Sequence, residues 1–274
     1  CGKNQVLKKE NVNETNQEQA TENKETAEEQ QENTNNDTEE QSQSQIDYIN
    51  IAPEEVKIPI LMYHSISDED PSNNLLVPPA MFEEQMAWLE ANNFTAMNMD
   101  EALEAMRTGK VPKRPVVITF DDGYANNYTS AFPSLKNHKL KATFFVITDG
   151  VDNGYYMSSD NLKEMQDAGM SIENHTANHL ELNNLSKTDA YESIKRAQDY
   201  LRNVIGSDGN YLCYPVGKYN DETIQIEEEL GIKAAVTTQG GFASINDGLH
   251  TLKRVRISPM SIEGFASIFS EYIN

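Results

Sequence analysis

The sequence predicts an α/β fold, a distorted or incomplete (β/α) barrel. From about residue 55 onward, short apolar segments alternate with longer amphipathic segments, which is the pattern of parallel strands joined by helices. No segment repeats another, and the alternation supplies about six to eight β/α units, enough for a barrel. The functional site of such a barrel is expected at the carboxyl ends of its strands.

The first half of the alternation begins with IPILMYHS at 58–65, an apolar segment that predicts a strand. A helix is expected over 78–93, where Phe82, Met86 and Leu89 recur at helical spacing. The elements expected next are a strand at 94–98, a helix at 99–108 that ends at Gly109, a strand at 115–120, a helix at 126–139 and a strand at 142–147.

In the second half, the clearest element is a long helix at 186–206, which Ser186 and Asp189 begin with a capping arrangement. The other elements expected here are a helix at 158–169, strands at 170–174 and 210–215, a helix at 220–231, strands at 234–238 and 252–257, and a C-terminal helix from Ser261.

The beginning of the chain has a different composition. Residues 2 to about 45 are mainly Glu, Gln, Asn, Thr and Lys, with no aromatic residue and no proline. Such a segment cannot bury enough surface to offset its chain entropy. We therefore predict a disordered acidic tether over residues 1–50 and one folded domain over 55–274.

Cys1 opens the sequence, and CGKNQ followed by a long polar segment resembles a mature bacterial lipoprotein. On this resemblance we expect a lipid on Cys1 and an extracellular protein anchored to the outer face of a bacterial membrane; the alternative is an arbitrary sequence boundary. No stretch approaches the roughly 18 apolar residues that span a bilayer, so the lipid would be the only membrane contact. The other cysteine, Cys213, is then expected to be a reduced thiol.

The charge of the chain excludes one class of partner. The formal net charge is -22, with 44 acidic and 22 basic residues, and no cluster of Lys and Arg occurs. A protein that binds phosphate backbones needs a basic patch. We expect no nucleic-acid partner, and we expect a monomer.

Two adjacent carboxylates, Asp121 and Asp122, stand where the predicted strand 115–120 ends, in TFDDG. Burial penalises both charges, and each repels the other. Asp-Gly is also an ordinary turn signal. A functional carboxylate pair and a solvated turn are both compatible with this stretch alone.

Two histidines four residues apart, His175 and His179, directly follow the predicted strand 170–174. If the chain turns helically there, both imidazoles lie on one side and can share a metal ion. Together with one carboxylate they make an open three-ligand site that leaves a position for water. Either histidine alone is also compatible with a surface or core role.

The third motif, YPVGKYN, follows a predicted strand with a turn at Pro215 and Gly217. In this order, TFDDG, HTxxH and YPxG resemble the polysaccharide deacetylases of carbohydrate esterase family 4, the NodB-homology domain, from about Ile58 to Ile268. ILMYHSI and YPVGKYN look most like the branch that includes deacetylases of poly-N-acetylglucosamine. The resemblance implies a barrel of the NodB-homology type.

The resemblance also implies roles for the motif residues. Asp122, His175 and His179 match the metal ligands, Asp121 matches the general base, and the backbone amide of Val216 matches an oxyanion donor. A divalent cation would offset the repulsion between the two carboxylates and lower the pKa of water. Zn²⁺ is the first choice for two imidazoles and a carboxylate, with Co²⁺ or Ni²⁺ as alternatives.

The chain departs from the family pattern at three places. Cys213 stands where the family commonly has an arginine that orients the base, Leu180 replaces the proline that often follows the second histidine, and no clear Leu-x-His motif supplies the usual general acid. His64 and His250 are the candidates for that acid, with Asp121 itself as the alternative.

The predicted function is metal-dependent de-N-acetylation of an extracellular polysaccharide that contains N-acetylglucosamine, by attack of metal-activated water on the acetamide. Poly-N-acetylglucosamine, peptidoglycan and chitin oligomers all present this group. Tyr124 and Tyr214, which adjoin two of the motifs, are candidates for holding sugar rings. The alternatives are a carbohydrate O-acetyl esterase and a catalytically impaired glycan-binding surface domain.

Overall fold

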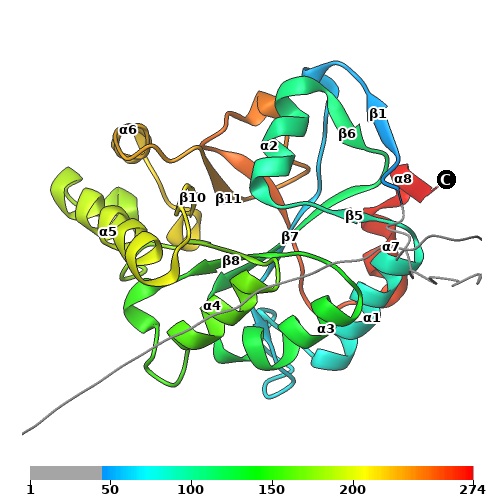
Figure 1. The fold of residues 1–274 in the computed structure, drawn as a ribbon, viewed down its shortest axis with the longest axis horizontal. Helices are drawn as coiled ribbons and strands as arrows, with labels where there is room; N and C mark the ends of the chain where they lie inside the picture. Colours follow the sequence, from blue (N-terminus) through cyan, green and yellow to red (C-terminus); the bar gives the residue numbers. More distant parts are fainter. Residues whose placement is uncertain (1–44, 274) are drawn as a thin grey trace, which may run out of the picture. The chain divides into compact units, whose positions relative to one another are not determined.

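The computed structural model describes residues 45–273 (Figure 1). Seven of its strands are parallel and form a closed ring. Their order is β2-β12-β11-β10-β9-β8-β7, and the pairing of β2 with β7 completes the ring. The strands are β2 (Ile60–Tyr63), β7 (Pro115–Asp122), β8 (Thr143–Val146), β9 (Ser171–Asn174), β10 (Tyr211–Cys213), β11 (Ala234–Gly240) and β12 (Leu252–Arg256). The expected (β/α) barrel is confirmed.

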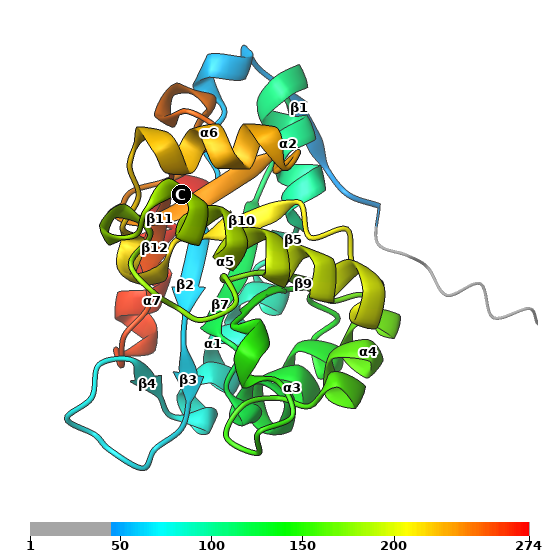
Figure 2. The same cartoon turned by 90° about the vertical axis from the view of Figure 1, so that its left-hand side faces the viewer.

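Helices surround this ring and also cover one of its ends. In Figure 2, α2 lies near the top, whereas the short strands β3 and β4 lie near the bottom, beyond the end of β2. The helices are α1 (Pro79–Ala91), α2 (Met99–Thr108), α3 (Phe132–Asn137), α4 (Ser159–Asp167), α5 (Lys187–Tyr200), α6 (Asp221–Glu229), α7 (Ile262–Ile268) and α8 (Ser270–Ile273). A π-helical turn, Asn127–Ala131, precedes α3, so the helix expected at 126–139 is divided.

All strands and helices expected from the sequence are present, and several short strands are additional. These are β1 (Tyr48–Asn50), β3 (Ser65–Ile66), β4 (Leu76–Val77) and β6 (Lys110–Pro112). β5 (Thr95–Ala96), which the sequence does predict, pairs with the first residues of β7. A strand of two or three residues is too short to show the period-two alternation by which strands are recognised.

β1 corrects the expected end of the N-terminal tether. It pairs antiparallel with β6, with Tyr48 opposite Pro112. Paired structure therefore begins inside the range 1–50 that we assigned to the tether. Residues 1–44, with Cys1, lie outside the described residues, so the lipid, the membrane anchor and the extracellular location stay predictions. Within 45–273, no helix is both long enough and apolar enough to cross a membrane.

β7 is buried along its whole length, and its two faces meet different parts of the core. Val116, Ile118 and Phe120 belong to the cluster that packs against the outer helices. Val117 packs instead with barrel-interior residues from other strands, which include Ile60, Phe145, Cys213, Val236 and Leu252. Because side chains alternate along a strand, Thr119 and Asp121 share the interior face with Val117, and Asp121 comes to lie inside the barrel.

Candidate active site

The motif residues meet where the barrel strands end. Asp121 and Asp122 are the last two residues of β7, and Cys213 is the last residue of β10. His64 directly follows β2, and His175 directly follows β9. The site therefore lies at the carboxyl ends of the strands, as the sequence analysis expects for a barrel of this kind.

Asp122, His175 and His179 converge on one point. The Oδ1 atom of Asp122 lies 3.0 Å from Nε2 of His175 and 3.3 Å from Nε2 of His179. The side chain of His175 is 2 % exposed and that of His179 is 33 % exposed, so the group opens to solvent on one side. Burial alone would raise the pKa of Asp122, but its hydrogen bonds to the two histidines outweigh burial and hold that pKa well below its usual range.

The loop that carries the two histidines is not helical, which corrects the geometry that we expected from their spacing. Thr176 and His179 have φ angles of 64° and 56°, in the left-handed region. The Asn174 side chain accepts a hydrogen bond from the Thr176 backbone at 2.7 Å, and the Thr176 hydroxyl accepts one from the His179 backbone at 3.0 Å. These bonds fold the loop so that the ring centroids of His175 and His179 lie 4.8 Å apart, with the ring planes at 73° to each other.

His175 has a second contact that fixes its tautomer. Its Nδ1 atom lies 2.7 Å from the backbone carbonyl oxygen of Cys213, which can only accept a hydrogen bond. Nδ1 therefore carries a proton, so Nε2 is the nitrogen that faces Asp122 and can bind a metal ion once it releases its own proton. A histidine held through Nδ1 by a carbonyl is the usual second contact of a metal-ligating imidazole. The group of Asp122, His175 and His179 thus fits a divalent metal ion with nitrogen and oxygen ligands.

Arg254 is the site residue that sequence reasoning missed. It lies on β12, is fully buried, and donates hydrogen bonds to both carboxylate oxygens of Asp121, at 2.7 and 2.8 Å. Its remaining donors bind the Thr119 hydroxyl at 3.1 Å, the Thr237 carbonyl at 2.8 Å and the Cys213 sulfur at 3.3 Å. The only signal in the sequence was an arginine inside LKRVRI, a segment that otherwise reads as a buried strand.

Arg254 also sets the charge of Asp121. Burial alone would raise the pKa of this carboxyl group, but the charge and hydrogen bonds of Arg254, with a smaller contribution from His64, outweigh burial and lower the pKa to about 2. Asp121 is therefore an ionised carboxylate with a fixed orientation. An unpaired buried carboxylate would be far less stable.

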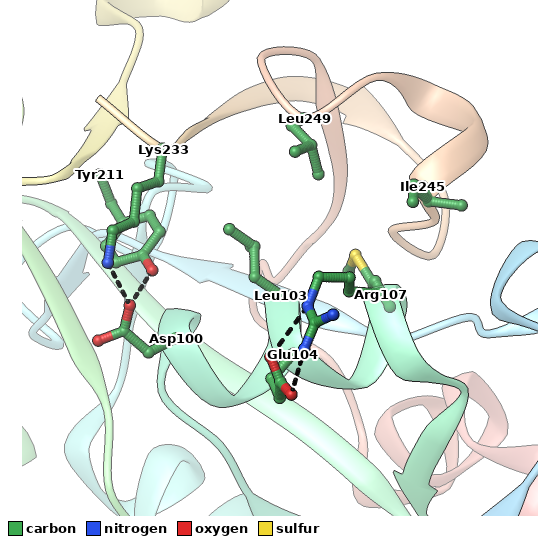
Figure 3. Close-up of a pocket in the computed structure, with 9 residues that line it drawn as sticks. Asp100, Leu103, Glu104, Arg107, Tyr211, Lys233, Ile245 and Leu249 are labelled. Atoms are coloured by element: carbon green, nitrogen blue, oxygen red, sulfur yellow. Dashed lines mark hydrogen bonds and ion pairs between the residues drawn. The ribbon is translucent and has the colours of Figure 1, made fainter. Parts of the chain in front are cut away.

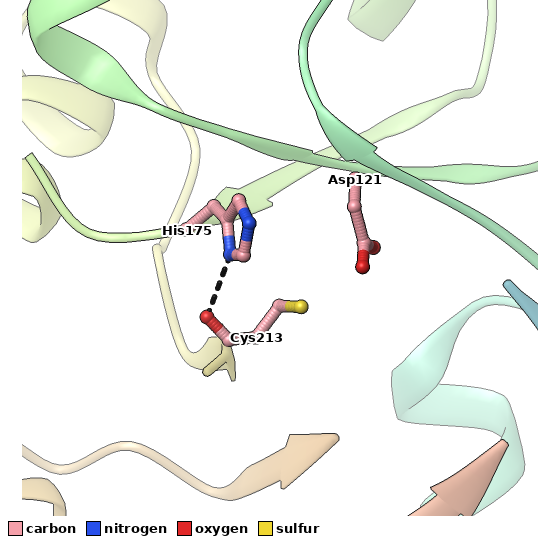
Figure 4. Close-up of side chains that lie close together, drawn as sticks. All are labelled: Asp121, His175 and Cys213. Atoms are coloured by element: carbon pink, nitrogen blue, oxygen red, sulfur yellow. Dashed lines mark hydrogen bonds between the residues drawn. The ribbon is translucent and has the colours of Figure 1, made fainter. Parts of the chain in front are cut away.

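A second group of candidate metal ligands, Asp121, His175 and Cys213, overlaps the first (Figure 4). All three are buried, and Cys213 is a free thiol. Both oxygens of Asp121 and the sulfur of Cys213 already accept hydrogen bonds from Arg254. A cation here would lie against the guanidinium charge, so the open group around Asp122 is the better metal site.

The two histidines proposed as general acids have different surroundings. Nε2 of His64 lies 3.6 Å from Asp121 Oδ2, and burial lowers the pKa of this imidazole. His64 is thus part of the site. His250 instead pairs with the buried Glu227 of α6, at 3.1 Å, and no contact connects it with the site carboxylates among the described residues. We therefore drop His250 as a candidate.

The two tyrosines proposed for sugar binding also differ. Tyr124 is partly exposed, and burial together with the nearby Asp122 charge raises the pKa of its phenol. Tyr214 is 1 % exposed, and its hydroxyl donates to Glu227 at 2.5 Å. Its ring stacks on Tyr219 with the centroids 4.8 Å apart. Tyr214 offers no free face to a sugar, so its proposed role in substrate binding is wrong.

Val216 has a backbone conformation that is rare for a branched residue. Its φ and ψ are 49° and 22°, and the side chain is 54 % exposed. The next residue, Gly217, has φ of 71°, and a Cβ atom there would lie 2.2 Å from the Thr238 hydroxyl. Strained backbone of this kind concentrates at functional sites, and it lies just beyond Cys213, whose carbonyl binds His175.

A cavity of about 370 Å³ lies away from these residues, between α2 and the β10–β11 region (Figure 3). Its polar groups are already paired with each other. Asp100 contacts Tyr211 and Lys233, and Glu104 pairs with Arg107. None of the motif residues lines this cavity.

A parallel barrel with two imidazoles and a carboxylate at the ends of its strands is an arrangement suited to hydrolytic metal chemistry. The family description "polysaccharide deacetylase" matches residues 108–235. The Bacillus subtilis (strain 168) protein YxkH, which is named for the polysaccharide deacetylases, is 40% identical over 218 residues, or 79% of this chain and 76% of that protein.

Two other proteins that resemble this chain are also named as deacetylases. A Staphylococcus epidermidis poly-beta-1,6-N-acetyl-D-glucosamine N-deacetylase is 27% identical over 230 residues, 74% of this chain and 80% of its own length. The solved structure of the Streptococcus pyogenes deacetylase PplD in complex with acetate superposes with a TM-score of 0.76 and 36% identity, over 78% of this chain and 98% of that chain. The chain belongs to the polysaccharide deacetylase family, which is generally metal-dependent, and the resemblance seen in its motifs is confirmed.

Proposed function

We propose that this polysaccharide deacetylase removes N-acetyl groups from an extracellular polysaccharide that contains N-acetylglucosamine, in a reaction that depends on a divalent metal ion. The observation that carries the proposal is the open group of Asp122, His175 and His179 next to the ionised Asp121. Asp122, His175 and His179 supply the metal ligands, and Asp121 supplies a proton acceptor within the same buried region.

Asp122, His175 and His179 would hold the metal, and Zn²⁺ is our first choice for this ligand set, with Co²⁺ or Ni²⁺ as alternatives. When bound, such an ion lowers the pKa of water and stabilises negative charge on a carbonyl oxygen. The Cys213 carbonyl holds His175 in the tautomer that this role needs.

The protein residues account for the proton transfers. Asp121 accepts a proton from the attacking water, whose oxygen forms a bond to the acetamide carbon. The backbone amide of Val216 donates a hydrogen bond to the carbonyl oxygen as it becomes negative. When the bond from carbon to nitrogen breaks, the leaving amine takes up a proton and acetate is released. His64, 3.6 Å from Asp121, is our candidate for that proton donor, with Asp121 itself as the alternative.

The polymer is the finer part of the proposal. Poly-β-1,6-N-acetylglucosamine is our first choice, because the Staphylococcus epidermidis relative is named for this substrate. Peptidoglycan is the second choice. The contact of Arg254 with Asp121 favours an active enzyme over an impaired glycan-binding domain, since Cys213 in place of the usual arginine was a main reason to consider impairment.

Acetate release tests the proposal directly. We expect the Zn²⁺-loaded protein to release acetate from oligomers of β-1,6-linked N-acetylglucosamine, and the chelator-treated protein to lose this activity. Peptidoglycan fragments and an O-acetylated sugar serve as comparison substrates. Release from the O-acetylated sugar alone would identify an esterase, and binding without release at any metal loading would identify a glycan-binding domain.

A further inference from the structure

Three tyrosine rings form a cluster next to the candidate metal site. Tyr124 lies two residues after Asp122, and Tyr155 and Tyr156 lie in the loop between β8 and α4. The rings of Tyr124 and Tyr156 are nearly parallel, at 23° with centroids 5.7 Å apart. The ring of Tyr155 stands at 82° to that of Tyr124, with centroids 5.8 Å apart, and at 90° to that of Tyr156, with centroids 5.0 Å apart.

The backbone connects this cluster to the site. Ala125 donates a hydrogen bond to the Tyr155 carbonyl at 3.2 Å, and Met157 donates one to the Gly123 carbonyl at 2.9 Å. The β8–α4 loop is therefore attached on both sides of Tyr156 to the segment that follows the aspartate pair. Its tyrosines keep a fixed position relative to Asp122.

The loop is also fixed from within. The Asn153 side chain accepts hydrogen bonds from the backbone amides of Tyr155 and Tyr156, at 2.9 and 3.1 Å. Gly150 lies under the Tyr156 ring, where a Cβ atom would come within 2.6 Å of the ring. A binding surface that is already ordered loses little conformational entropy when a ligand binds.

Tyr155 is the exposed member of the cluster. The residue is 66 % exposed, the largest exposed fraction among the large hydrophobic residues that the structure describes. The other two rings contact it and leave much of its surface to solvent. The C–H groups on one side of a pyranose ring carry partial positive charge, and they pack well against the negative face of an aromatic ring.

We propose that Tyr155 is a stacking platform for a pyranose ring of the polymer, next to the sugar whose acetamide reacts, and that Tyr124 and Tyr156 hold it in place. The identity of the sugar rests on the proposed function. Extended substrates use this platform, whereas a short substrate that occupies only the reacting position does not reach it.

Steady-state kinetics on a long and a short N-acetylglucosamine oligomer test this inference. We expect Tyr155→Ala to raise KM for the long oligomer about 2- to 10-fold, the range for losing one aromatic stacking contact. The value of kcat on the short oligomer should not change. Tyr155→Phe keeps the ring and should behave as the unmodified protein. Tyr48→Ala, which removes another exposed tyrosine, from β1, is the matched control.

Binding of the long oligomer, measured by calorimetry, separates this inference from the proposed function. An unchanged KM and an unchanged Kd in Tyr155→Ala overturn the stacking platform, and so does a Tyr155→Phe variant as weak as Tyr155→Ala. If no acetate is released by any variant but Tyr155→Ala alone binds the oligomer more weakly, the platform is supported and the proposed activity is wrong. If the unmodified protein neither binds nor deacetylates the oligomer, both fail.

Discussion

Arg254 and Asp121 lie 133 positions apart in the sequence, yet the guanidinium of one donates a hydrogen bond to each carboxylate oxygen of the other. The two strands involved, β12 and β7, are both neighbours of β2 in the ring. Their side chains therefore meet inside the barrel. Arg254 also donates a hydrogen bond to the sulfur of Cys213, the residue at which the family resemblance had led us to expect an arginine.

Arg254→Met should reduce acetate release by about 10- to 100-fold, because Asp121 loses its fixed orientation. It should also lower the free energy of unfolding by about 3 kcal/mol or more, since a buried carboxylate is left without its partner. Arg254→Lys keeps the charge but cannot donate two parallel hydrogen bonds, so we expect an intermediate activity. Urea unfolding and acetate release measure the two effects.

Placing an arginine at position 213 instead is the control for the role of Arg254 as the partner of Asp121. Cys213→Arg alone places two guanidinium groups together and should destabilise the protein. Cys213→Arg combined with Arg254→Ala should recover part of the activity, because the new side chain replaces the lost partner of Asp121. Equal inactivity of the double variant and Arg254→Ala would show that the direction from which the arginine approaches is essential.

The sequence predicted the barrel and most of its elements because each long element carries its own local signal. The helix 99–108, for example, ends at a glycine with φ of 81°, as its C-terminal sequence indicates. The number of strands and the closure of the ring depend instead on which distant strands pair. The pairing of β2 with β7 has no signature in either segment.

The motif residues were predictable for a related reason. Asp122 ends one strand, and His175 and His179 lie in the loop after another, and parallel strands bring their carboxyl ends together. Arg254 lies within a strand, and only the geometry of the ring shows that its side chain reaches Asp121. The exposure of Tyr155 and the burial of Tyr214 likewise depend on how the loops pack.

The two adjacent aspartates should respond differently to the same change. Asp122→Asn should lower both metal content and activity, because an amide is a poorer ligand than a carboxylate. Asp121→Asn should keep the metal but reduce turnover about 100-fold or more, the scale for losing a positioned general base. Metal content after dialysis is measured beside acetate release, with Asp160→Asn on α4 as the control. Loss of metal from Asp121→Asn alone would reverse the two roles.

Glu173 should make stability depend on pH. Burial raises the pKa of this carboxyl group to about 8 in the folded protein, although a hydrogen bond from the Tyr211 backbone opposes the shift. In the unfolded chain the group ionises near its ordinary value of 4.5. Between these two values the folded state binds more protons than the unfolded state, so the free energy of unfolding falls as pH rises, by at most about 1.4 kcal/mol per pH unit.

Glu173→Gln removes this titration and keeps an acceptor for the Tyr211 amide. Relative to the unmodified protein, the variant should therefore be more stable at pH 8 than at pH 5. Urea unfolding at the two pH values gives the comparison, and effects of other titrating groups cancel in the difference. A stability difference that is the same at both pH values would contradict the raised pKa.

Gly217 should be required for the turn that presents the Val216 amide. Its φ of 71° suits glycine, and any Cβ atom there would lie 2.2 Å from the Thr238 hydroxyl. Gly217→Ala should therefore cost about 1 kcal/mol or more of stability.

If Val216 is the oxyanion donor, the kcat of Gly217→Ala should fall more than its KM rises, because the donor acts on charge that develops in the transition state. Gly217→Ala with Thr238→Ala relieves the clash but not the unfavourable φ, so stability should recover only in part. Full activity in the single variant would exclude the Val216 amide from the reaction.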